Sequence, residues 1–230
     1  ENLGVGRDVE EQGSAYNSLR PVHAWRLRSD SRSQLFKISQ VQVAENMTEV
    51  KAQTNEAMTR PMSLASVQTK LDDVSRGLLR ICKDIETDNH SGEDVNIRLL
   101  LHGTKVAFLR SLLASGLDEK FSDGLFGKGT YLAEDASKID QYCTSDPGEE
   151  GHATVEGLNK LHHDLYAKNG LQHPGSVHYA VVCAIVIGMP IYTKDGESHL
   201  QDPGMGVFAT AEKRQLAAVP DSDPPVRYHT

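Results

Sequence analysis

The amino-acid sequence predicts an α+β fold for this chain of 230 residues. Two short apolar segments, residues 97–101 and 177–187, have the character of buried strands, and helical patterns lie before and between them. Strand and helix do not alternate regularly, which argues against a parallel α/β sheet. The sequence also lacks both G-x-G-x-x-G and G-x-x-x-x-G-K-S/T. A bound nucleotide would therefore be held without a Rossmann or phosphate-loop cradle.

The N-terminal part of the chain, residues 21–90, is expected to pack as a strand and helices on the rest of the fold. Apolar residues recur at helical spacing in two stretches, and the second is interrupted by Gly77, which would allow a split. We interpret the apolar stripe of the second stretch as core packing. The elements expected here are an irregular arm over residues 1–20, a strand over 22–27, a helix over 31–55, and one helix or two short ones over 64–85.

The core is predicted to span residues 91–230. A turn signal at 88–92 precedes it, and glycines and prolines separate its later pieces. The elements expected in the core are a strand over 97–101 that ends in His102-Gly103-Thr104, a helix over 106–115 stopped by Gly116, a strand over 130–133, a short helix ending at Tyr142, a helix over 155–168, and a strand over 177–187.

Composition excludes several functions. The formal net charge is -8, from 24 basic and 32 acidic side chains, which argues against a broad nucleic-acid surface. No apolar run reaches the roughly 18 residues of a membrane-spanning helix. The three cysteines are widely spaced and show no metal-binding pattern with histidine, so we expect no metal. They suit a reducing compartment, the cytoplasm or nucleus. The chain begins at Glu1, so a leader or a longer parent sequence is expected to precede it.

The first segment that carries chemistry is the end of the 97–101 strand. It places the imidazole of His102 beside Gly103, whose backbone has no side chain to keep a planar ligand amide at a distance. A histidine before a glycine is more often part of a turn or a satisfied buried residue. This segment alone therefore does not indicate a ligand-binding site.

The second segment is residues 126–143, which read FGKGTYLAEDASKIDQYC. Two glycines precede a strand, and Tyr131 and Tyr142 follow. If one tyrosine lies on the strand and the other on the next helix, their rings could flank one flat group such as nicotinamide. A tyrosine in a strand is more often a core residue, so this segment also needs support from the first.

Taken together and in this order, the two segments resemble the signature of the poly(ADP-ribose) polymerase family. The resemblance is dense over residues 99–143 and looser over 22–47, which is similar to a divergent microbial-type branch, and over 177–230. It implies the ADP-ribosyltransferase fold: split antiparallel or mixed β-sheets that form an NAD cleft, with flanking helices. NAD would serve as substrate, with no metal.

The resemblance also implies roles for individual residues. His102 would hydrogen-bond the ribose of the adenosine half of NAD, the Gly103 backbone would bind the nicotinamide amide, and Tyr142 would stack on the nicotinamide ring. His102 and Tyr131 would be the catalytic residues. The full set expected to contact NAD is His102, Gly103, Thr104, Gly129, Tyr131, Ser137 and Tyr142.

Two departures from the family pattern stand out. Ile139 occupies a position where the family often has a serine that reaches the nicotinamide amide, and losing that hydrogen bond would weaken binding by about 0.5–1.5 kcal/mol. In the family, a segment like 226–230 is followed by a strand bearing the catalytic glutamate, and no such strand is in this sequence. A carboxylate is needed to stabilise the oxocarbenium-like transition state. Solvated charge is the favoured interpretation of the candidate substitutes Glu134, Asp135, Asp195 and Glu197.

Two functions therefore remain open at the level of sequence. The first is an NAD-dependent ADP-ribosyltransferase that moves ADP-ribose to an unknown protein acceptor, more as single units than as polymer, and releases nicotinamide. The second is a catalytically inactive protein of the same fold, which serves as an NAD-binding or structural subunit of a larger assembly. Neither function calls for direct contact with nucleic acid or a membrane span.

Overall fold

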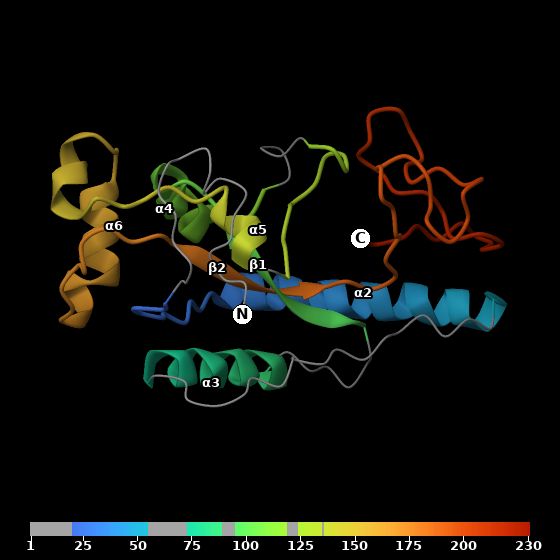
Figure 1. The fold of residues 1–230 in the computed structure, drawn as a ribbon. Coiled ribbons are helices and arrows are strands. Elements are labelled where there is room, and N and C mark those ends of the chain that lie inside the picture. The colour runs from blue at the N-terminus through green and yellow to red at the C-terminus, as the bar shows by residue number, and fades with distance from the viewer. Residues whose placement is uncertain (1–19, 55–72, 89–94, 119–123, 135) are drawn as a thin grey trace.

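A computed structural model of the chain describes residues 20–54, 73–88, 95–118, 124–134 and 136–230 (Figure 1). At its centre β1 (Ile97–Gly103) pairs antiparallel with β2 (Ala180–Val186). On the opposite edge of β1, Leu101 exchanges backbone hydrogen bonds with Ala133, at 2.8 and 2.9 Å. Helices surround this small sheet, which confirms the α+β class. Within the described residues, the sheet has two strands, and the bridge between Leu101 and Ala133 is its one extension.

Helix α2 (Asp30–Thr54) confirms the helix expected over residues 31–55, and it contacts β2 (Figure 1). Only part of its apolar stripe is core. Met47 and Val50 are buried, whereas Leu35, Ile38 and Val41 are each more than half exposed. In the first half of the helix, the described residues do not cover the apolar stripe.

Helix α3 (Asp73–Asp88) contacts β1 and runs through Gly77 without a break. The alternative of two short helices split at this glycine was wrong, since intrahelical hydrogen bonding tolerates glycine at a modest free-energy cost. Residues 64–72 of the expected helix lie outside the described residues. Among the described side chains of α3, Cys82 is the buried one.

The expected strand over residues 22–27 is absent, and this segment is irregular. Its rings pack instead: Trp25 lies edge-on to Tyr166 with 5.2 Å between ring centroids, and His23 lies 5.8 Å from the same ring. Aromatic contact therefore fixes the segment where no neighbouring strand pairs with it.

Four further elements are shorter than expected. The helix expected to end at Tyr142 ends at Asp140, and the strand expected over residues 177–187 spans Ala180–Val186. The strand over residues 130–133 reduces to the single bridge at Ala133. The helix over 155–168 divides into α6 (Leu158–Leu165) and the 3-10 turn η3 (Ala167–Asn169). Gly157 precedes α6 with a φ of 74°, a left-handed conformation that glycine adopts without steric cost and that delays the start of the helix.

Two hydrophobic clusters form the core. The first joins α2 to the C-terminal segment, and the second joins α4 (Val106–Ser115) to α6. They share no buried member. The first contains Met47, Val50, Val95, Met189, Val219 and Val226, and the second contains Val106, Leu109, Leu158, Leu161, Leu165 and Tyr166.

The C-terminal end of α4 is held from two sides. Gly116 adopts a φ of 90°, and its N–H donates to the Leu112 carbonyl at 2.8 Å. Arg32 of α2 donates to the carbonyls of Leu113 and Ala114, at 3.1 and 2.7 Å. These bonds satisfy carbonyls that a helix end leaves without intrahelical partners. Among the helices of the described ranges, none has the length and apolar character needed to cross a membrane.

Candidate functional site

His102 is held at the end of β1 by a hydrogen bond across the sheet. Its Nδ1 lies 3.0 Å from the backbone carbonyl oxygen of Tyr131. A carbonyl only accepts, so Nδ1 must donate, and Nε2 of the neutral ring is left as an acceptor. The structure therefore links the two residues expected to be catalytic and presents a ring nitrogen suited to accept a ribose hydroxyl proton.

Tyr131 is fixed through its hydroxyl group. The hydroxyl donates to the Gly127 carbonyl at 2.7 Å and accepts from the Phe126 N–H at 3.1 Å. The ring remains 37% exposed, so its position is set while part of its surface stays available. Gly124 is required beside it, because a Cβ there would lie 2.7 Å from the hydroxyl.

The turn that holds Tyr131 is joined to the C-terminal part of the chain. The N–H of Lys128 donates to the Lys213 carbonyl at 2.9 Å. Gly127 has a φ of 89°, and a Cβ there would meet the Phe208 ring at 2.5 Å. Residues after 190 therefore help position the motif tyrosine.

Gly103 allows helix α5 (Ala136–Asp140) to lie directly on β1. A Cβ at this position would clash with the carbonyl oxygen of Ile139. The sequence suggested that this glycine leaves room for a ligand amide, and the structure shows that it also leaves room for a helix. Ile139 itself is buried, at 5% exposure, so an apolar side chain at this position fills the contact between α5 and the rest of the fold.

Tyr142 follows α5 and is anchored by its backbone, whose N–H donates to the Ile139 carbonyl at 3.0 Å. Its side chain is 53% exposed, and Nζ of Lys138 lies 5.7 Å from its ring centroid. The ammonium group of Lys138 thus lies near the face of the ring. A bound nicotinamide ring, which is also cationic, would take the place of this ammonium group.

The remaining predicted site residues surround this group. Thr104 is half-buried directly after β1. Gly129 is half-buried, and no atom of the described part of the chain lies within 4 Å of where its Cβ would be. Ser137 belongs to α5, but its side chain lies outside the described residues. The structure thus gathers the motif around β1 and α5, and contact with NAD stays a prediction for every member.

Two of the carboxylates considered as substitutes are engaged elsewhere. Glu134 pairs with Arg98 at 2.7 Å. Asp195 accepts hydrogen bonds from the backbone N–H groups of Glu197 and Ser198, which hold its pKa well below the usual range. Both groups therefore have local structural tasks, and Asp135 lies outside the described residues.

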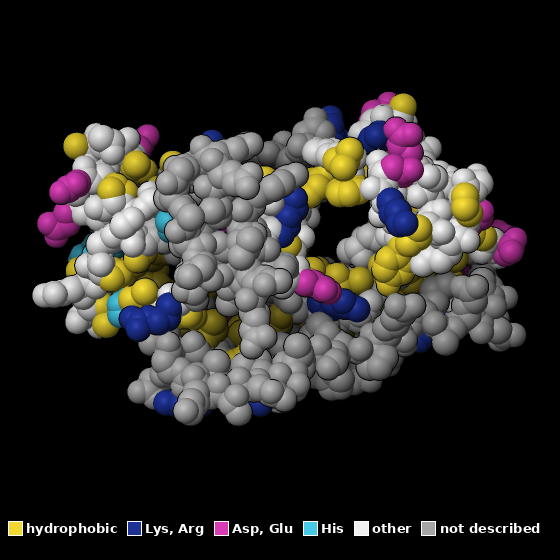
Figure 2. Space-filling view, viewed as in Figure 1, with side chains coloured by type: hydrophobic (Ala, Val, Ile, Leu, Met, Phe, Trp, Pro, Cys, Tyr) yellow, Lys and Arg dark blue, Asp and Glu magenta, His cyan; other side chains and the backbone are white. Residues whose placement is uncertain are grey.

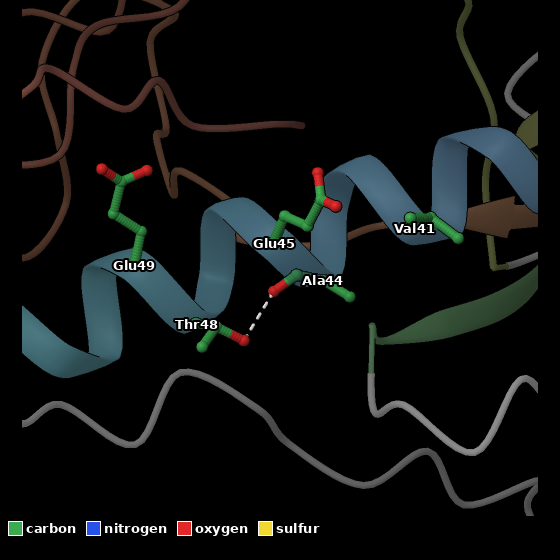
Figure 3. Close-up of a pocket in the computed structure, with 5 residues that line it drawn as sticks. All are labelled: Val41, Ala44, Glu45, Thr48 and Glu49. Carbon is green, nitrogen blue, oxygen red and sulfur yellow. Dashed lines mark hydrogen bonds between the residues drawn. The ribbon is translucent and has the colours of Figure 1, made fainter.

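The hollow drawn in Figure 3 lies on α2, and no motif residue lines it. Its volume is about 570 Å³, and it is open to solvent on one side of the helix. Glu45 and Glu49 stand one turn apart beside it, and Thr48 donates to the Ala44 carbonyl at 2.8 Å. Two carboxylates at its rim would repel a pyrophosphate, so the hollow is a poor dinucleotide site.

A second polar group, the Asp146 cluster, is buried next to the motif: Asp146, His162, His173 and Tyr179. Oδ2 of Asp146 lies 2.7 Å from His162 Nε2, 3.3 Å from His173 Nε2 and 2.8 Å from the Tyr179 hydroxyl. This cluster was not predicted from the sequence. The available signal was local enrichment, because five of the ten histidines lie between residues 152 and 178.

A model of the family described as the poly(ADP-ribose) polymerase catalytic domain matches residues 12–189. The match includes α2, both strands and every residue of the motif. The chain therefore belongs to the poly(ADP-ribose) polymerase catalytic domain family. Membership implies the α+β ADP-ribosyltransferase fold and NAD as the substrate.

Proposed function

We propose that this domain binds NAD and transfers single ADP-ribose units to a protein acceptor, with release of nicotinamide. The observation that supports this most is the His102–Tyr131 hydrogen bond. It fixes the imidazole at the strand end with Nε2 as an acceptor, in the chemical form needed to bind a ribose hydroxyl. Tyr131 and Tyr142 add two partly exposed rings of the kind that bind a flat cationic group.

The reaction breaks the glycosidic bond between the nicotinamide nitrogen and C1 of the attached ribose. Nicotinamide leaves with the bonding electron pair, positive charge develops on the ribose, and an acceptor nucleophile forms the new bond as it loses its proton. The residues of this site would contribute by orientation: His102 would hold the adenosine ribose, and the tyrosine rings would hold the leaving group in place.

NAD binding measured by calorimetry tests the first part of this proposal. We expect wild type to bind NAD and His102→Ala to bind at least about tenfold more weakly, since a charge-neutral hydrogen bond of about 0.5–1.5 kcal/mol and the ring contact are both lost. His163→Gln is the matched control, because His163 is exposed on α6. Absence of NAD binding by the folded wild-type protein, or equal affinity in His102→Ala, would overturn the proposal.

A second candidate function is an NAD-binding or structural subunit without transferase activity. The engagement of Glu134 by Arg98 and of Asp195 by its own loop favours it, because both carboxylates already have bonding partners within the protein. Incubating the protein with labelled NAD and cell extract separates the two functions. Discrete labelled bands support single-unit transfer, a ladder indicates polymer, and NAD binding without any labelling favours the subunit.

A further inference from the structure

The Asp146 cluster places an unusual number of donors on one buried oxygen. The Asp146 side chain is fully buried, and those of His162 and His173 are 8% and 10% exposed. The Gly175 N–H donates to His173 Nδ1 at 3.2 Å, so the ring proton of His173 sits on Nε2 and faces Asp146.

With the hydroxyl of Tyr179 and Nε2 of His162, three donors then converge on Oδ2 of Asp146. A carboxylate oxygen has two lone-pair directions, so it cannot accept three well-directed hydrogen bonds at once. The other oxygen, Oδ1, accepts the Gly148 N–H at 2.9 Å, so both oxygens of Asp146 act as acceptors. The aspartate thus offers a hard oxygen ligand in a histidine-lined site.

The same atoms fit the requirements of a divalent transition-metal ion. One atom each from Asp146, His162 and His173 lie within 4.8 Å of one another. Nitrogen and oxygen ligands at about 2.0–2.2 Å from a tetrahedral zinc ion stand roughly 3.3 Å apart, so small side-chain movements suffice. Imidazole and carboxylate together suit zinc, nickel or cobalt better than magnesium or calcium.

The surroundings of the cluster also suit an ion. Nδ1 of His162 lies 2.7 Å from Nε2 of His152, which can accept the proton that a metal-bound imidazole carries on its other nitrogen. With Nε2 of His173 on the ion, the ring proton of His173 would move to Nδ1. The N–H of Gly175, an exposed residue, would then donate to water instead of Nδ1. The Tyr179 hydroxyl, 2.8 Å from Oδ2 of Asp146, is near enough to hydrogen-bond a water that fills the fourth coordination position.

We propose that Asp146, His162 and His173 bind one divalent transition-metal ion, zinc by ligand type, as a structural site. When the ion binds, the hydrogen bonds from His162 and His173 to Asp146 are replaced by one metal–ligand bond from each of the three residues. It cross-links three parts of the chain: the segment after Tyr142, helix α6 and the segment that leads into β2.

The site has a direct connection to the NAD motif. Thr144 accepts a hydrogen bond from the N–H of Val106 at the start of α4, at 3.0 Å. The Cys143 thiol donates to the Tyr179 carbonyl at 3.4 Å, and the neighbouring Ala180 pairs with Gly103. Metal binding therefore stabilises the segment that begins at Tyr142.

Metal titration of the full chain, stripped with a chelator, tests the proposal. We expect one Co²⁺ per chain with the absorption bands of a nitrogen- and oxygen-coordinated ion, displaced by Zn²⁺. Zn²⁺ at about 100 times its dissociation constant should raise the melting temperature by about 5–10 °C. Failure of the folded wild type to bind either ion would overturn the proposal.

Matched variants locate the ion. His162→Gln and His173→Gln should each weaken binding by tenfold or more, whereas His163→Gln, on the same helix but exposed, should bind as wild type does. Because His162→Gln removes a buried side chain and could fail to fold, His173→Gln, checked by circular dichroism, decides the matter. Equal binding by wild type and His173→Gln would place the ion elsewhere and overturn the proposal. His102→Ala must keep the ion, which separates this test from that of NAD binding.

Discussion

Gly103 is the residue at which the sheet and the candidate NAD site meet. Gly103→Ala should lower the free energy of unfolding by about 1–3 kcal/mol, because the new Cβ would clash with the Ile139 carbonyl and push α5 off β1. Urea denaturation measures the change. Gly129→Ala, with open space at its Cβ, should leave stability unchanged or slightly raised. Equal stability of the two variants would contradict this account of the packing.

The hydroxyl group of Tyr131 is expected to matter for stability as well as for binding. Tyr131→Phe loses one bond to the Gly127 carbonyl and one from the Phe126 N–H, which should cost about 1 kcal/mol in urea denaturation. Tyr142→Phe is the control, since the described residues offer its hydroxyl no hydrogen bond and stability should not change. A Tyr131→Phe protein as stable as wild type would show that the turn holds without this hydroxyl.

His229 gives the protein a predicted dependence of stability on pH. Burial lowers the pKa of His229, whose Nδ1 accepts the Met189 N–H at 3.0 Å. The unfolded chain, with a histidine pKa of about 6.5, then binds more protons than the native state, so this contribution is complete above about pH 6.5 and is lost as pH falls through the native pKa. His229→Gln should flatten the stability profile between about pH 5 and 7. An unchanged slope in that variant would exclude His229 as its cause.

At the scale of elements, α3 carries a glycine that its surroundings do not require. Gly77 lies in the helix interior, and among the described residues no atom comes within 4 Å of where a Cβ would be. Gly77→Ala should therefore raise the free energy of unfolding by about 0.5–1 kcal/mol, from the helix propensity of alanine. Gly124→Ala should act in the opposite direction, because its Cβ would meet the Tyr131 hydroxyl. Thermal and urea denaturation of both variants check the two signs.

The elements that could be predicted from sequence are those with local signals. Helix α4 has the expected bounds, because its apolar period and the glycine stop at Gly116 are both encoded within a dozen residues. The segment over 22–27 has a strand pattern, but a strand also needs a partner, and that partner is not a local property. Its place is set by the ring of Tyr166, far along the chain.

The residues of the candidate site also differ in whether local sequence signals could predict them. The order of His102, Tyr131 and Tyr142 predicted the family, because the motif is dense in one stretch of sequence. The Asp146 cluster draws on residues sixteen and eleven positions apart, Asp146 to His162 and His162 to His173, with no spacing that marks a metal site. Only the folding of α6 and the segment after it brings these atoms together.

At the scale of the whole molecule, the two hydrophobic clusters should contribute independently. Met47→Ala in the first and Leu161→Ala in the second should each cost about 2–5 kcal/mol, since both side chains are buried. The clusters share no member, so the double variant should match the sum of the single effects within about 0.5 kcal/mol. Urea denaturation of the three variants gives the coupling energy, and a value well above that bound would mean that strain passes between the clusters.

Helix α2 connects the C-terminal end of α4 to the first hydrophobic cluster. Arg32 near its start fastens it to the end of α4, and Met47 and Val50 near its other end sit in the first cluster. Each residue of an α-helix turns the chain by about 100°, so an insertion between Arg32 and Met47 would rotate one fastening away from its partner. Most residues between Arg32 and Met47 are exposed, with Gln40 a buried exception, so the exposed positions should accept many substitutions. The number of residues in this stretch should not change, because both ends of the helix must keep their orientation.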